Sequence, residues 1–307
     1  MFTRTLNRLL LTISMCCLAA TANAALIDDA RAAFNRGDYA EAFKLHRTLA
    51  AQGDVTSQGL LGFLYEQGQG VTQDYKEAMK WYRLAAPQGN AVVQNNLGAM
   101  YLNGQGVTQD YKEAMKWFRL AAAQGYANAQ FSLGVMYYHG RGVTQDYQEA
   151  LKWYKLAAAQ GNSTAQYNIG LMYEYGKGVT QSSQEAMRWY KLAAAQGDAE
   201  AQHNIGYMYN IGQGVTQDYQ EALKWYKLAA AQGVARAQTN LGLMYGKGQG
   251  APQDFIRAHM WGNLASAAGN PDGAKSRDLI AERMTLQQIE KAQDMARKCR
   301  ARSFKGC

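Results

Sequence analysis

The sequence predicts an all-α protein built from tandem helix-turn-helix repeats of 36 residues. Three observations lead to this fold class. All six tryptophans stand 36 residues apart, at Trp81, Trp117, Trp153, Trp189, Trp225 and Trp261. Roughly half of the other repeat positions match in every copy, and each copy contains start and stop signals for two helices. A fixed period of about 20–50 residues is typical of solenoids, in which each unit buries its apolar face on its neighbours.

The first 24 residues have the layout of a secretory signal peptide. Two arginines form a basic start, an apolar stretch follows, and residues 22–24 read Ala-Asn-Ala, an A-x-A cleavage site. We therefore expect cleavage near Ala24 and export to the periplasm or out of the cell. One alternative is an uncleaved anchor, although the apolar run is shorter than the ~20 residues of a membrane span. Another is a lipoprotein anchor at Cys16 or Cys17, whose preceding residues fit poorly.

Residues 25–53 are predicted to form a shorter N-terminal capping repeat, and six full copies follow over residues 54–269. In the copy at 90–125, the first helix is expected over 90–103. It ends at Gly104-x-Gly106, because glycines just past a helix supply the left-handed backbone of a C-terminal cap. Gly98 lies within this helix, costs about 1 kcal/mol relative to alanine, and recurs in every copy. A neighbouring ring or backbone is therefore expected to pack closely there.

The second helix of the same copy is predicted to open at Asp110, with Glu113 three residues later, a spacing that resembles a capping box. Its apolar residues are Tyr111, Ala114, Trp117, Phe118 and Ala121, which form one stripe at three- and four-residue spacing. The recurring indole is expected to be the large buried anchor of each repeat, matched to the recurring glycine of the first helix.

Residues 270–307 are predicted to form C-terminal capping helices, the last of them beginning at Thr285 and followed by a basic tail. After removal of the leader, Cys299 and Cys307 are the remaining cysteines. We expect them to form one disulfide in an oxidising compartment. The alternative is two free thiols, and a zinc site is not expected because two cysteines without a nearby histidine are too few ligands.

The net charge of +8 is concentrated at the ends of the chain. Without the leader it is +6, and residues 289–307 alone carry a net +4. Such a tail suits a helix C-terminus, or contact with an anionic surface. Export and the near-neutral body argue against a nucleic-acid partner, and no later segment is long and apolar enough for stable membrane insertion.

The repeat pattern A-x-x-x-L-G-x-M-Y-x-x-G-x-G-V-x-x-D-Y-x-E-A-x-x-W-Y-x-x-A-A-x-Q-G resembles the SEL-1-like repeat, a branch of the tetratricopeptide-like solenoids. It covers residues 54–269 almost without gaps. The resemblance implies a right-handed α/α superhelix and a scaffold for protein–protein interaction, and bacterial members of the family are often exported. One secreted subgroup has a disulfide in every repeat. Because these repeats contain no cysteine, we do not expect that subgroup's properties here.

The first helices vary most at four positions, seen at residues 128, 131, 135 and 138 of the third copy, which share one helical face. In the family's geometry the first helices line the concave side, so this face is the predicted binding groove. The candidate partner-binding residues are Phe131, Val135, Tyr138, Tyr167, Leu171, Tyr175, His203 and Tyr207. An aromatic centre with a polar surround is a common arrangement of binding anchors. The alternative is that these rings only pack between adjacent first helices.

The sequence contains no motif that predicts catalysis, a cofactor or a metal site. The four histidines lack metal-ligand spacing, and the chain has no H-E-x-x-H, G-x-S-x-G or S-x-x-K. We therefore predict a non-enzymatic exported scaffold with a protein or peptide partner in the cell envelope or outside the cell. The alternative is a binder of cell-wall glycan or a regulator of peptidoglycan-processing enzymes. A third hypothesis, a β-lactamase-like or envelope hydrolase, has no nucleophile–base pair to support it.

Overall fold

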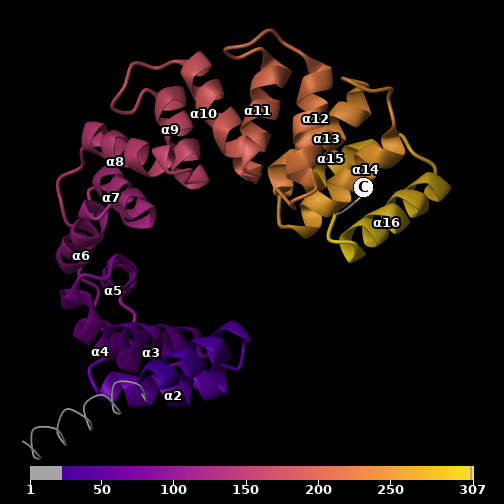
Figure 1. Ribbon diagram of the computed structural model, residues 1–307. Helices are drawn as coiled ribbons and strands as arrows, with labels where there is room; N and C mark the ends of the chain where they lie inside the picture. Colours follow the sequence, from indigo (N-terminus) through magenta and orange to yellow (C-terminus); the bar gives the residue numbers. More distant parts are fainter. Residues whose placement is uncertain (1–22, 305) are drawn as a thin grey trace, which may run out of the picture. The chain divides into compact units, whose positions relative to one another are not determined.

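The computed structural model describes residues 23–304 and 306–307, and the regular structure in this part of the chain is helical (Figure 1). The helices group into an N-terminal unit, which ends at Gln145, and a C-terminal unit, which begins at Asp146. The predicted signal peptide lies outside the described residues except for positions 23 and 24, which begin a helix over residues 23–35.

The N-terminal unit continues from this helix with pairs of helices joined by short loops. Its elements are α2 (Tyr39–Ala51), α3 (Val55–Gln67), α4 (Tyr75–Ala85), the short 3₁₀ helix η1 (Ala86–Gln88), α5 (Ala91–Asn103), α6 (Tyr111–Ala123) and α7 (Ala127–His139). The first helix of each repeat packs against the second, as α3 does on α4 and α5 on α6.

The C-terminal unit repeats the arrangement and adds two further helices. Its elements are α8 (Tyr147–Ala159), α9 (Ser163–Tyr175), α10 (Ser183–Ala195), α11 (Ala199–Ile211), α12 (Tyr219–Ala230), α13 (Ala235–Lys247), α14 (Phe255–Ala267), α15 (Pro271–Ala281) and α16 (Leu286–Ala301). The pairs α9/α10, α11/α12 and α13/α14 are full repeats, and α15 and α16 both pack on α14. The predicted all-α fold of tandem helix pairs is therefore confirmed.

The helix ends follow the expected cap chemistry, except that the predicted capping box of Asp110 and Glu113 is not completed. Asp110 Oδ1 accepts hydrogen bonds from the backbone N–H of Lys112 (2.9 Å) and Glu113 (3.0 Å), and Gly104 ends α5 in the left-handed conformation with φ of 68°. The Glu113 carboxylate forms an ion pair with Lys116 one turn further on (3.4 Å). A complete capping box, with both hydrogen bonds, forms at Thr285 and Gln288, where α16 begins.

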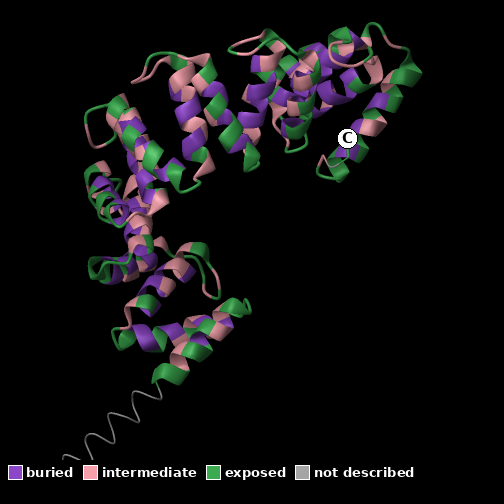
Figure 2. Ribbon diagram, turned by 45° about the horizontal axis from the view of Figure 1, so that its top comes forward, coloured by how far each residue is buried: buried purple, intermediate pink, exposed green. Residues whose placement is uncertain are grey.

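The fully buried ring of each inner repeat is the residue that follows the tryptophan. Tyr82, Phe118, Tyr154, Tyr190 and Tyr226 are at most 1% exposed, whereas the tryptophans that precede them are half-buried. A Cβ added to Gly170 would lie 2.5 Å from Cε1 of Tyr190, so the helical glycine faces this ring. The expectation that the indole pairs with the glycine is thus corrected. The indole instead packs at the side, as Trp225 does against the cluster formed by α10 and α11. Figure 2 shows buried positions along the helix faces that meet.

A buried glutamine connects successive repeats. Gln166 of α9 donates from Nε2 to the carbonyl oxygen of Ala158 in α8 (3.2 Å), and Gln202 of α11 bonds Ala194 of α10 in the same way (3.5 Å). Gln196 Nε2 then donates to Gln166 Oε1 (2.7 Å). Because an unsatisfied buried amide is costly, these bonds help to fix one repeat on the next.

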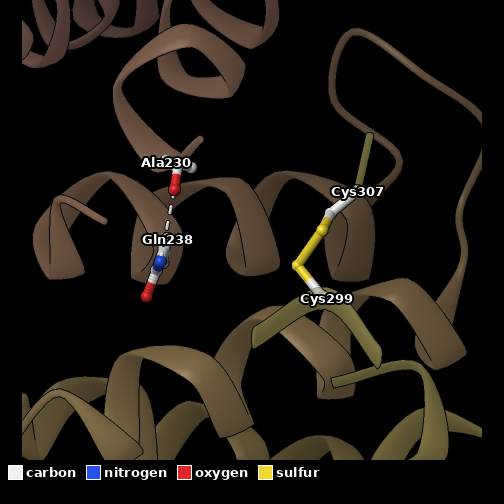
Figure 3. Close-up of a disulfide and its surroundings, with 4 residues drawn as sticks. All are labelled: Ala230, Gln238, Cys299 and Cys307. Atoms are coloured by element: carbon white, nitrogen blue, oxygen red, sulfur yellow. Dashed lines mark hydrogen bonds between the residues drawn. A yellow bond between two sulfur atoms is a disulfide. The ribbon is translucent and has the colours of Figure 1, made fainter. Parts of the chain in front are cut away.

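The C-terminal end is closed by a disulfide between Cys299 of α16 and Cys307, with Cα atoms 5.6 Å apart (Figure 3). Near it, Gln238 of α13 donates to the carbonyl oxygen of Ala230 in α12 (3.3 Å). Phe304, between the two cysteines, packs against the cluster that contains Trp261 and Leu264 of α14. A Cβ added to Gly233, in the loop after α12, would lie 3.2 Å from the Phe304 ring, so this ring also contacts the preceding repeat.

Candidate interaction surface

In the C-terminal unit, two positions of each first helix carry large side chains that are exposed, except for Leu171, which is half-buried. The two positions are four residues apart and so lie on one helical face. The pairs are Leu171 and Tyr175 on α9, Tyr207 and Ile211 on α11, and Leu243 and Lys247 on α13. Tyr175 is 61% exposed, Tyr207 42%, Ile211 46% and Leu243 37%. We call these six residues the first-helix surface.

Beneath this surface lies a layer of buried rings and their hydrogen bonds. Tyr190 of α10 donates its hydroxyl hydrogen to Glu174 of α9, and the Tyr167 ring lies 5.7 Å from the Tyr190 ring. Burial, followed by the bond to Glu174, raises the pKa of Tyr190 far above its usual value. Burial also raises the pKa of Tyr167. Both phenols therefore stay protonated and can donate hydrogen bonds.

His203 of α11 belongs to the same buried layer. Its ring lies 5.7 Å from the Tyr226 ring. Its Nδ1 is 3.1 Å from Asn204 Oδ1, and its Nε2 is 3.3 Å from Asn240 Nδ2. The amide oxygen requires a hydrogen on Nδ1, and the amide nitrogen requires a lone pair on Nε2. Both contacts thus fit the neutral imidazole, and burial lowers the pKa of His203 in the same direction.

Charged groups stand beside the exposed rings. Arg236 of α13 forms an ion pair with Glu200 of α11, and both side chains are about half-exposed. The Glu174 carboxylate, followed by partial burial, raises the pKa of Tyr175. Arg236 lowers the pKa of Tyr175 and Tyr207 raises it, and both effects are smaller than those of Glu174 and burial. The surface thus combines apolar contact area with donors and acceptors at its border.

In the N-terminal unit, the three predicted site residues lie on α7. Phe131, Val135 and Tyr138 are each half-buried. The Tyr138 ring lies 5.0 Å from the ring of the exposed His139, in an edge-on orientation.

The predicted site residues of the C-terminal unit divide into two sets. Tyr167 and His203 take part in the buried ring layer, while Leu171, Tyr175 and Tyr207 belong to the first-helix surface. Sequence reasoning missed Ile211, Leu243 and Lys247, which share that surface. The spacing of four from Tyr207 to Ile211 was the available signal.

The described residues bring together few groups of chemical interest outside this surface. They contain no cluster of three or more His, Cys, Asp or Glu side chains that could hold a metal ion. A serine–histidine contact does occur, between Ser57 Oγ of α3 and His46 Nδ1 of α2 at 2.9 Å. Such a pair can activate a nucleophile, but Ser57 is only 1% exposed and His46 3%. His46 and Ser57 are eleven residues apart and match no sequence motif, so the sequence did not predict this contact.

Fold and surface together define an all-α repeat protein whose first helices expose large apolar side chains. The Sel1 repeat model matches residues 35–54, 55–90, 91–126, 127–162, 163–198, 199–234 and 235–270. These segments cover most of the chain, which therefore belongs to the Sel1 repeat family. Among the described residues, none of the helices has both the length and the apolar character needed to cross a membrane.

Two solved structures illustrate the similarity. A Sel1 repeat protein from Oxalobacter formigenes is 40% identical, over 79% of this chain and 99% of that chain, with a TM-score of 0.74. A protective antigen present in uropathogenic Escherichia coli strains, which displays an SLR fold, is 27% identical over 87% of this chain and 73% of that chain, with a TM-score of 0.52. A comparison with curated proteins found no match.

Proposed function

We propose that this protein is a non-enzymatic scaffold that acts after export and binds a protein or peptide through its first-helix surface. The observation that carries the proposal is the exposure of four large apolar side chains at these two positions of α9, α11 and α13, namely Tyr175, Tyr207, Ile211 and Leu243. Tyrosine supplies a large, rigid contact area at a low entropic cost. Phe131, Val135 and Tyr138 are the candidates in the N-terminal unit, and of these Val135 stands at the repeat position of Leu171 and Tyr207. Membership in a family of repeat scaffolds supports the proposal.

Export is supported by two features of the chain. Residues 1–24 have the signal-peptide layout, and the disulfide Cys299–Cys307 suits an oxidising compartment such as the periplasm or the exterior of the cell.

Site-specific photocrosslinking in intact cells tests the proposed surface. The photoreactive residue p-benzoylphenylalanine is placed at Tyr207, and in a matched control at Leu228 of α12, which is 50% exposed on a second helix. We expect a defined protein adduct, identifiable by mass spectrometry, from position 207 and not from position 228. A protein labelled at Ile211, on the same surface, should form the same adduct, and the double variant Tyr175→Ala, Tyr207→Ala with that label should lose it while keeping the far-UV circular dichroism of the parent. Equal adducts from positions 207 and 228 would contradict the proposal.

Cell-wall glycan is the second candidate partner, because two exposed tyrosine rings beside the Glu200–Arg236 pair could stack on sugars and bond their hydroxyls. Co-sedimentation with purified sacculi distinguishes the two. Retention on sacculi that the double variant loses, without a protein adduct at position 207, would favour the glycan.

A further inference from the structure

One repeat position of the first helices, which we call the ring column, carries an aromatic side chain in the inner repeats of the C-terminal unit. There the Tyr167 ring lies beside Tyr190 and the His203 ring beside Tyr226, each pair tilted and with ring centroids 5.7 Å apart. In α3 of the N-terminal unit the same position is Gly59. The ring column therefore contributes no side chain beside Tyr82, the buried ring of that repeat.

Val93 of α5 fills only part of the space that the missing ring leaves. A Cβ added to Gly59 would lie 2.8 Å from Cγ2 of Val93, so the valine occupies the volume next to the glycine. The later repeats have alanine at the position of Val93, namely Ala129, Ala165, Ala201 and Ala237. At these two positions the chain therefore has Gly59 and Val93, where the inner repeats of the C-terminal unit have an aromatic residue and an alanine. Because a valine side chain is smaller than a tyrosine side chain, an opening remains.

This opening, which we call the Gly59 pocket, has a volume of about 370 Å³ and is lined mainly by Phe34, Gly59, Leu60, Phe63, Val92 and Val93. An apolar cavity of roughly 150 Å³ is large enough for benzene, so one aromatic side chain fits. The Phe34 and Phe63 rings, with centroids 6.2 Å apart and planes tilted by 59°, form one wall. Aromatic rings favour such tilted and edge-on neighbours.

We propose that the Gly59 pocket receives one uncharged aromatic side chain, Phe or Tyr, of a peptide partner, which completes the ring column of that repeat. The residues that line the pocket include no charged side chain, and its polar groups are those of Thr56, Asn90, Asn96 and Tyr82. An uncharged ring therefore fits the pocket better than a charged group. The pocket lies in the N-terminal unit and is separate from the first-helix surface, so either proposal can fail without the other.

The test uses the purified protein and a fluorinated probe, N-acetyl-para-fluorophenylalanine amide, observed by fluorine NMR. The key variant is Gly59→Tyr combined with Val93→Ala, which reproduces the ring and alanine found at Tyr167 and Ala201. This variant fills the pocket with the chain's own side chain in a combination that the fold already accommodates. A second variant, Val92→Glu, places a carboxylate at a half-exposed position of the lining and so tests the pocket without altering its buried part.

We expect the parent protein to bind the probe and both variants to bind it at least about tenfold more weakly, a change equivalent to about 1.4 kcal/mol. Unlabelled N-acetyl-phenylalanine amide should displace the probe, whereas N-acetyl-alanine amide should not. Equal binding by the parent and both variants would overturn the proposal. So would displacement by chitotriose in preference to phenylalanine amide, because the pocket would then select a sugar. The variant Tyr175→Ala, Tyr207→Ala should bind the probe like the parent.

Discussion

The inner repeat α11/α12 and the terminal repeat α13/α14 use the same three positions of the second helix in different ways. In α12, Trp225 is half-buried, Tyr226 is fully buried and Leu228 is half-exposed. In α14 the matching residues are Trp261, Gly262 and Leu264, and the tryptophan and leucine are each only 3% exposed. The buried aromatic anchor has therefore moved by one residue, from the position after the tryptophan to the tryptophan itself.

The neighbours of the two repeats explain this difference. A Cβ on Gly262 would lie 3.1 Å from Cα of Arg277, so α15 approaches the backbone of α14 where an inner repeat has a large ring. Helix α16 packs on α14, and its Ala292 and Ala296 belong to the same buried cluster as Leu264. The burial of a repeat position is thus decided by the element that packs on it, and a change from Tyr to Gly lets a capping helix replace the next repeat.

The largest expected effect is on the free energy of unfolding. The most costly replacement should be that of the ring after the tryptophan in the inner repeat, and that of the tryptophan itself in the terminal repeat. Tyr226→Ala should lower the free energy of unfolding by about 3–5 kcal/mol, because it removes a fully buried ring. Trp225→Ala should cost about 1–2 kcal/mol, because that indole is half-buried. In the terminal repeat, Trp261→Ala should cost as much as Tyr226→Ala. Urea denaturation followed by circular dichroism measures all three, and an equal loss for Trp225→Ala and Tyr226→Ala would contradict the assignment of the anchor.

This comparison also marks how far the sequence could predict the fold. The 36-residue period, the helix pairs and the close approach at the helical glycine all followed from recurring residues such as Gly206 and Asp218. The choice between Trp225 and Tyr226 did not follow, since both belong to the apolar stripe and adjacent residues are only about 100° apart on a helix. A tryptophan in every copy favoured the indole, but contacts with the neighbouring helices decide which ring is enclosed.

The candidate surface was predictable to a similar degree. The variable face of the first helices could be read from the copies, but a ring on that face can pack inward or point outward. Tyr167 and His203 pack on rings of the second helices, whereas Tyr175 and Tyr207 stand one to two turns away and remain exposed. The Gly59 pocket could not be foreseen, because it depends on how far Val93 fills the space left by a missing side chain.

A second prediction contrasts two glycines of the first helices. Gly206→Ala should destabilise the protein by about 1–3 kcal/mol, because the added Cβ would lie 2.8 Å from the buried Tyr226 ring. Gly246→Ala is the matched control in α13, where the nearest atom would be 3.5 Å away, an ordinary contact. Alanine there should stabilise by about 0.5–1 kcal/mol through its helix propensity. Thermal unfolding of both variants tests the pair, and a loss of stability in both would show that the ring contact is not the cause.

A third prediction concerns the buried glutamines. In the inner repeat, Gln232 Nε2 donates to Gln202 Oε1 (2.9 Å). In the terminal repeat, Ala268 stands at the position of Gln232, and Gln238 Oε1 has no hydrogen-bond partner among the described residues. Ala268→Gln should therefore stabilise the protein by about 1 kcal/mol, and Gln232→Ala should destabilise it by a similar amount. Shifts of the urea midpoint in the same direction for both variants would exclude this account.

The smallest expected effect is on the pH dependence of stability. Burial lowers the pKa of His203 in the inner repeat and of His259 in the terminal repeat. Arg236 also lowers the pKa of His203 while Glu200 raises it, and Arg277 and Asp278 act in the same two directions on His259. As pH falls below the ordinary histidine value of 6.5, the unfolded chain binds protons that the folded protein does not yet bind. The stability contributed by these neutral imidazoles is therefore complete above that value and is lost as pH falls toward the folded-state pKa.

The replacements His203→Tyr and His259→Leu, which copy Tyr167 and Leu223 of neighbouring repeats, should each reduce the decrease in melting temperature between about pH 7 and pH 5. The control is His139→Gln in the N-terminal unit. Because His139 is exposed, this replacement should leave the decrease in melting temperature unchanged. If His203→Tyr alone flattens the profile, His259 becomes protonated without loss of its packing, and the terminal repeat then tolerates a charge that the inner repeat excludes. If neither replacement changes the profile, the acid sensitivity comes from groups outside these two rings.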